Sequence, residues 1–133
     1  MAERLILDTG VLIAAERGTP LDQVVESDDD VAVAAITIAE LRTGVELATT
    51  RHRAARGAFL QAVLATLPVE PYDTATASAH ARLLAHVHRS GTTRGAHDLI
   101  VASTALATER TIITTDRGAR FGDLPGVDCL LVD

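Results

Sequence analysis

Short apolar runs and longer amphipathic segments alternate along the chain, which predicts alternating strands and helices. The runs of strand length are residues 5–7, 31–35, 111–115 and 127–132, with a short extended link or edge strand at 69–72. The segments with helical spacing of apolar residues are 11–15, 21–27, 37–47, 51–67, 74–89 and 96–108. This order predicts an α/β fold, a three-layer α/β/α sandwich with a mainly parallel central sheet.

Polar residues next to these segments predict caps and turns. Thr9 is expected to cap the first helix and Thr37 the helix that ends near residue 47, and Thr37-x-x-Glu40 fits a capping box. The run Asp28-Asp29-Asp30 predicts a solvated turn. The segment 96–108 is almost entirely apolar, which predicts a helix at the centre of the fold.

Composition fits one compact domain. The 133 residues, 47% hydrophobic and only 2% aromatic, predict a core built from Ala, Val, Leu and Ile. The single cysteine, Cys129, excludes an internal disulfide framework and lies in an apolar run, so we expect it to be buried. The beginning of the chain is strand-like and carries Glu3 and Arg4, unlike a signal peptide, and no apolar stretch is long enough to span a bilayer. We therefore expect a cytoplasmic protein with no membrane partner.

The charge pattern narrows the classes of function. The net charge of −6 argues against non-specific binding to nucleic acid. All of the basic side chains are arginine, some of them gathered at Arg51, Arg53 and Arg56 and again at Arg89 and Arg94. Arginine suits bidentate contacts with phosphate, whereas the simpler interpretation of each arginine is a solvated helix face.

The absence of lysine excludes several phosphate-handling classes. A P-loop requires Gly-Lys-Ser/Thr, and a phosphorylatable receiver domain requires a lysine late in the chain. A phosphatase of the haloacid-dehalogenase type requires Asp-x-Asp after its first strand, but Asp8 is followed by Thr9 and Gly10.

Four acidic residues stand beside apolar runs, where a carboxylate is costly unless it is paired or binds a metal: Asp8, Glu40, Asp98 and Asp116. Asp8 and Asp116 end predicted strands, whereas Glu40 and Asp98 lie in the first turns of helices. Because the carboxyl ends of parallel strands meet at one edge of a sheet, we expect the four to converge there. Taken singly, each also has a structural explanation, as a helix cap, a capping-box partner, an acid at a helix N-terminus, or a turn residue.

Clustered carboxylates suit hard cations such as Mg²⁺ or Mn²⁺, and such sites hydrolyse phosphodiester bonds with a metal-activated water. No serine lies in a nucleophile-elbow context, and the five histidines have no recognisable zinc-site spacing. His97 adjoins Asp98 and is expected to be a loop residue at the side of the site.

Four short motifs, in this order and spacing, resemble those of PIN domains, in particular the ribonuclease toxins of virulence-associated (VapBC-type) toxin–antitoxin pairs. They are Leu7-Asp8-Thr9, Ala39-Glu40-Leu41-x-x-Gly44, His97-Asp98-Leu99-Ile100-Val101-Ala102, and Thr114-Thr115-Asp116 followed by Phe121. The resemblance covers the whole chain, so residues 1–133 are expected to form a single PIN-like nuclease domain.

The resemblance implies an endoribonuclease that depends on Mg²⁺, or on Mn²⁺, and that cuts structured RNA such as tRNA or rRNA. Asp8 and Asp98 would be the principal metal ligands, and Asp116 would complete the coordination. Glu40 would hold a water or a second metal. The hydroxyls of Thr9 and Thr115 would orient these carboxylates, giving six site residues: Asp8, Thr9, Glu40, Asp98, Thr115 and Asp116.

The resemblance also implies partners. A cognate antitoxin protein would bind the toxin and push a segment, often with an arginine, among the carboxylates. A homodimer is expected besides this heteromer, and the candidate partner surfaces are residues 21–27 and 42–67. One departure is Arg120, which stands where many relatives carry an acid; contact with RNA phosphate and pairing with Asp123 are both open.

Two other interpretations of the sequence remain open. One is a non-catalytic PIN-type module that binds RNA or protein, although the presence of all four acids argues against it. The other is a metal-dependent phosphatase or DNA nuclease on a similar scaffold, and only substrate trials separate RNA from DNA.

Overall fold

The computed structural model describes residues 2–133 and contains a parallel sheet with strand order β3-β2-β1-β4-β5. Each neighbouring pair of strands is parallel. The strands are β1 (Arg4–Leu7), β2 (Asp30–Ala34), β3 (Val69–Glu70), β4 (Thr111–Thr114) and β5 (Cys129–Leu131). The predicted α/β sandwich with a parallel sheet is confirmed, and the link at 69–72 contains an edge strand.

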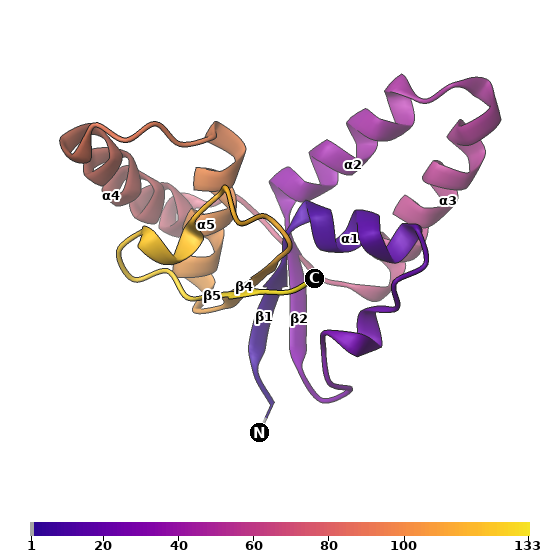
Figure 1. The fold of residues 1–133 in the computed structure, drawn as a ribbon, viewed down its shortest axis with the longest axis horizontal. Helices are drawn as coiled ribbons and strands as arrows, with labels where there is room; N and C mark the ends of the chain where they lie inside the picture. Colours follow the sequence, from indigo (N-terminus) through magenta and orange to yellow (C-terminus); the bar gives the residue numbers. More distant parts are fainter. Residues whose placement is uncertain (1) are drawn as a thin grey trace.

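The helices of the described residues form two antiparallel pairs and one short element. They are α1 (Thr9–Glu16), α2 (Ala35–Leu47), α3 (Thr50–Thr66), α4 (Thr74–Ser90) and α5 (Ala96–Thr108). Figure 1 shows the α2/α3 pair on one side of the sheet and the α4/α5 pair on the other, with α1 beginning directly above β1. No helix within residues 2–133 has the length and apolar character needed to cross a bilayer.

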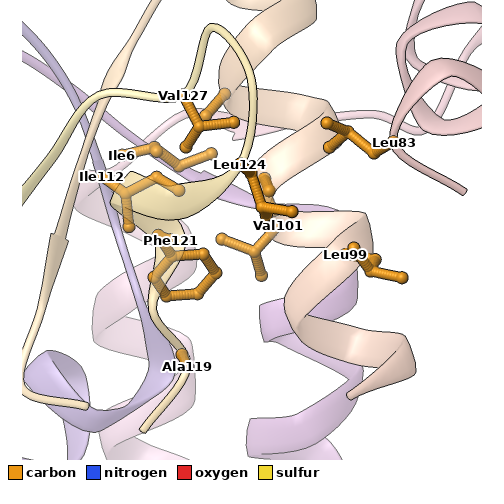
Figure 2. Close-up of a cluster of buried hydrophobic side chains, with 12 residues drawn as sticks. Ile6, Leu83, Leu99, Val101, Ile112, Ala119, Phe121, Leu124 and Val127 are labelled. Carbon is orange, nitrogen blue, oxygen red and sulfur yellow. The ribbon is translucent and has the colours of Figure 1, made fainter. Parts of the chain in front are cut away.

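Two hydrophobic clusters lie on the two faces of the sheet. Along β1, Leu5 and Leu7 belong to the cluster that α1 and α3 cover, whereas Ile6 belongs to the cluster beneath α5. This split follows from the alternation of side chains along a strand. Figure 2 shows Ile6 beside Phe121 and the residues of α5. The central position predicted for segment 96–108 is thus observed, since α5 contributes six buried residues: Leu99, Val101, Ala102, Ser103, Thr104 and Ala105.

Several local predictions were wrong. The helix expected at 21–27 is a single 3-10 turn, Leu21–Gln23, and Cys129 is half-buried rather than fully buried. The run 28–30 is more than a solvated turn. The carboxylate of Asp29 accepts hydrogen bonds from the backbone nitrogens of Glu3 and Glu26, at 3.0 and 2.8 Å, and Asp30 begins β2.

Candidate active site

Asp8 lies at the carboxyl end of the central strand, where β1 passes directly into α1. It is the N-cap of α1, in place of the predicted Thr9, and its Oδ1 accepts a hydrogen bond from the Thr9 nitrogen at 2.9 Å. Its Oδ2 accepts a hydrogen bond from the Thr114 hydroxyl at 2.8 Å. Both carboxylate oxygens of this buried side chain therefore have a hydrogen-bond partner.

Thr114, the last residue of β4, fixes two acids of the site. Besides donating to Asp8, its hydroxyl oxygen accepts a hydrogen bond from the Asp116 nitrogen at 3.0 Å. The sequence predicted this orienting role for Thr115, the next residue along the chain. The Thr115 hydroxyl instead packs against Gly10, where an added Cβ would come within 2.5 Å of it.

Glu40 is oriented by α1 and not by a capping box. Helix α2 begins at Ala35 with Ala34 as its cap, so Thr37 lies inside the first turn. The Thr37 hydroxyl is buried and has no hydrogen-bond partner within the described part of the chain. Glu40 accepts a hydrogen bond from the Thr9 hydroxyl at 2.8 Å, and its second oxygen lies 3.5 Å from Nδ1 of His97. The predicted cap and capping box are wrong, which removes the structural explanation for this acid.

Asp98 and Asp116 complete the acidic edge from the other side of the sheet. Asp98 lies in the first turn of α5, packed so closely against Gly95 that a Cβ there would come within 3.0 Å of its Oδ2. Asp116 follows β4 in an exposed turn, and its Oδ1 accepts a hydrogen bond from the Ala119 nitrogen at 3.2 Å. Arg120 extends from the same turn, and no ion pair joins it to Asp123 in residues 2–133.

The four carboxylates act on one another electrostatically. Burial raises the pKa of Asp98, and the charges of Asp8, Asp116 and Glu40 raise it further, whereas His97 lowers it. Burial also raises the pKa of Asp8, and the nearby Glu40 and Asp116 add to this, while the hydrogen bonds from Thr114 and Thr9 oppose it. The edge therefore concentrates negative charge in a partly dehydrated place.

The donor chemistry of this edge fits a hard divalent cation. All four groups are carboxylates, the ligands that Mg²⁺ and Mn²⁺ prefer, and the one ion pair that reaches them in residues 2–133 is the long contact between His97 and Glu40. As the side chains lie, no three His, Cys, Asp or Glu groups among the described residues are placed to hold one ion. Glu40 and Asp116 are each engaged by a hydrogen bond of their own.

Sequence analysis missed three residues that shape the site. Thr114 was missed because the strand was predicted to extend to Thr115, whereas β4 ends at Thr114 and places that hydroxyl at the carboxyl end of the strand. Gly10 and Gly95 each stand within three residues of a predicted acid, and that proximity was the available signal for a close approach.

The chain is similar to known proteins in both sequence and fold. Residues 5–125 match the family model described as PIN domain. The chain is similar to ribonuclease VapC5 of Mycobacterium tuberculosis, with 41% identity over 112 residues, which are 84% of this chain and 82% of the relative. It is also similar to ribonuclease VapC of Rickettsia bellii, with 27% identity over 96% of each chain.

Two solved structures resemble the whole fold. VapBC-5 from Mycobacterium tuberculosis, a member of the VapBC family of toxin–antitoxin systems, has a TM-score of 0.79 and 36% identity, covering 97% of this chain and 98% of that one. VapBC2 from Rickettsia felis, bound to a DNA fragment from its promoter, has a TM-score of 0.87 and 21% identity, covering 98% and 99%. The second likeness is one of fold alone.

Proposed function

This chain belongs to the PIN-domain family, and we propose that it is a metal-dependent endoribonuclease, the toxin of a toxin–antitoxin pair. The observation that carries the proposal is the gathering of Asp8, Glu40, Asp98 and Asp116, from four separate segments, at the carboxyl edge of the sheet. The Thr114 hydroxyl contacts both Asp8 and the Asp116 nitrogen, Glu40 accepts a hydrogen bond from the residue after Asp8, and Asp98 lies in the first turn of α5. The similarity to proteins named ribonuclease VapC supports the reaction class.

Each acid has a distinct part in the proposed site. Asp8, whose side chain is buried, and Asp98 would hold the cation, and Asp116 would complete its coordination. Glu40 positions the attacking water or a second cation, with its orientation set by the Thr9 hydroxyl. A bound Mg²⁺ or Mn²⁺ supplies charge neutralisation at the phosphate and makes the water more acidic. The substrate we propose is structured RNA, tRNA or rRNA.

An antitoxin is the proposed protein partner. A pocket of about 170 Å³ lies between α1, α2 and α3 and opens next to Glu40, with Phe59 and Leu60 among its apolar lining. A protein segment bound in this pocket would reach the carboxylates, and an arginine of that segment would form ion pairs with them. This supports one of the two expected partner surfaces, residues 42–67. Besides this heteromer we propose a homodimer, a single nuclease domain over residues 1–133, and a cytoplasmic location.

The test is cleavage of total cellular RNA by the antitoxin-free protein in Mg²⁺, in Mn²⁺ and in chelator, beside the Asp98→Ala variant. We expect discrete metal-dependent fragments from the wild type and a loss of at least about 10²-fold in the variant, because a ligand of the cation is removed. Equal fragments from both proteins would reveal a contaminating nuclease. Intact RNA with every metal, across tRNA and rRNA pools, would favour a PIN-type module that binds without cutting.

A further inference from the structure

The turn that carries Asp116 is held by an arginine from a different part of the chain. Arg94 lies in the loop between α4 and α5, four residues before Asp98. Its Nη1 donates to the carbonyl oxygens of Ala119 and Arg120, at 2.7 and 2.8 Å. A terminal guanidinium nitrogen carries two N–H groups, so one nitrogen can bind two successive carbonyls at once.

This turn has a backbone conformation that needs support. Arg120 adopts the left-handed region, with φ of 48° and ψ of 48°, which a residue with a side chain rarely occupies. On either side of it, Ala119 and Phe121 are buried in the cluster that includes Leu99 of α5, as Figure 2 shows. The turn at residues 119–121 is thus held by the packing of Ala119 and Phe121 in the core and by the hydrogen bonds from Arg94 to its two carbonyls.

This turn determines where Asp116 lies. The nitrogen of Ala119 donates to Oδ1 of Asp116, so the residue whose carbonyl Arg94 binds also holds the acid. Without such a link, an exposed acid on an irregular turn would move away from Asp8 and Asp98, because like charges repel. Arg94 joins the segment before Asp98 to the segment that carries Asp116.

We propose that Arg94 is a positioning residue that fixes the Asp116 turn relative to Asp98 and thereby sets the affinity of the acidic edge for a divalent cation. This rests on the proposed metal-dependent function, but it concerns geometry and metal affinity and can be measured without RNA. The arginine does not touch the substrate or the cation in this proposal. Its two hydrogen bonds act through Ala119.

The test compares Arg94→Met with the wild type and with Arg82→Met, which removes an exposed arginine from α4. Methionine keeps the unbranched stem but lacks the N–H donors, and Arg94→Ala serves as a second variant. Two quantities are measured: Mn²⁺ affinity by calorimetry, and hydrogen exchange of the Ala119 amide relative to that of Ala102 in the middle of α5. We expect both Arg94 variants to weaken Mn²⁺ binding by about tenfold. Their Ala119 exchange should be about fivefold faster or more.

The other outcomes distinguish failure of the positioning role from failure of the ribonuclease function. Unchanged Mn²⁺ affinity in the Arg94 variants would overturn the positioning role. Weaker Mn²⁺ binding with unchanged Ala119 exchange, or an equal loss in Arg82→Met, would show that the loss does not pass through the Asp116 turn and would overturn the proposal too. Loss of the arginine charge by itself would strengthen Mn²⁺ binding, because like charges repel. Equal acceleration at Ala119 and Ala102 would show general destabilisation, again against positioning. If the expected shifts appear but the wild type cuts no RNA, the ribonuclease proposal fails and the role of Arg94 stands.

Discussion

Charged side chains are arranged differently at the two ends of the parallel strands. Where the strands begin, opposite charges are paired: Arg4 of β1 contacts Asp30 of β2 at 2.6 Å, and Arg110, just before β4, contacts the same carboxylate at 3.1 Å. The guanidinium of Arg110 is buried and also donates to the carbonyl oxygens of Leu5 and Asp30, with Glu70 of β3 3.7 Å away. One arginine thus ties three strands together.

Where the strands end, like charges are gathered. Asp8 and Asp98 each have a pKa raised first by burial and then by the neighbouring acids, and the ion pairs of residues 2–133 offer them no arginine. Such an arrangement costs stability, whereas at the paired end the cost would come from removing one partner and leaving a buried charge uncompensated. The comparison teaches that charge has different roles at the two ends of one sheet: at one end it is paired across strands, and at the other like charges gather where we propose that a cation binds.

The largest expected effect on stability comes from breaking the paired end. Asp30→Ala leaves the buried guanidinium of Arg110 with only carbonyls and a distant Glu70, so the free energy of unfolding should fall by about 2–3 kcal/mol. Urea denaturation measures this loss. Asp28→Ala removes an exposed acid of the same run and is the matched control. Equal midpoints for the two variants would show that the pairing contributes nothing.

Adding metal should stabilise only through the acidic end. At a Mn²⁺ concentration 100-fold above its dissociation constant, roughly 2.7 kcal/mol of stabilisation is expected for the wild type. Thermal unfolding with and without Mn²⁺ measures it. The increment should survive in Asp30→Ala and largely disappear in Asp98→Asn, because only the second variant loses a proposed ligand. If Mn²⁺ stabilised Asp98→Asn as much as the wild type, the cation would bind at a site other than the acidic edge.

The smallest effect concerns the cost of the acidic end itself. The folded-state pKa of Asp8 is raised above its ordinary value of 3.8, so the folded protein retains this proton to a higher pH than the unfolded chain does. The resulting stabilisation is complete below pH 3.8 and is lost as the pH rises through the folded-state pKa. Asp8→Asn keeps the oxygen that caps α1 but removes the charge and the oxygen that accepts from Thr114. Removal of the charge should make it more stable than the wild type at neutral pH by at most about 1 kcal/mol.

Urea denaturation in chelator, from just above pH 3.8 to neutrality, tests this sign for Asp8. The difference between variant and wild type should widen with pH, and parallel profiles would contradict it. Asp73 provides the opposite case, because hydrogen bonds from Thr76 lower its pKa. Its contribution to stability should be lost only as the pH falls below 3.8.

The sheet and the acidic edge were accessible from the sequence because they depend on patterns that are local or topological. The apolar runs that end at Asp8 and Asp116 mark strand ends, and parallel strands bring their carboxyl ends together whatever the details of the loops. The family resemblance gave the same four acids. Strand ends read from the apolar runs, together with the rule for parallel strands, therefore predicted the edge at which the four acids lie.

The contacts that hold the site could not be read in the same way. Thr37 has the sequence of a cap, but β2 runs straight into α2, so the helix starts two residues earlier. Asp30 and Arg110 are 80 residues apart, and Arg94 and Ala119 are 25 apart. No local pattern joins such pairs, because tertiary packing decides which long side chain reaches which carbonyl or carboxylate.

The short edge strands of the sheet have a consequence for the protein outside any complex. At one edge, β3 has only two residues and lies between Pro68 and Pro71, which have no backbone N–H to donate to a further strand. At the other edge, β5 has three residues. Neither edge offers a long, flat row of free backbone groups, so the addition of strands from other copies of the chain at these edges is disfavoured.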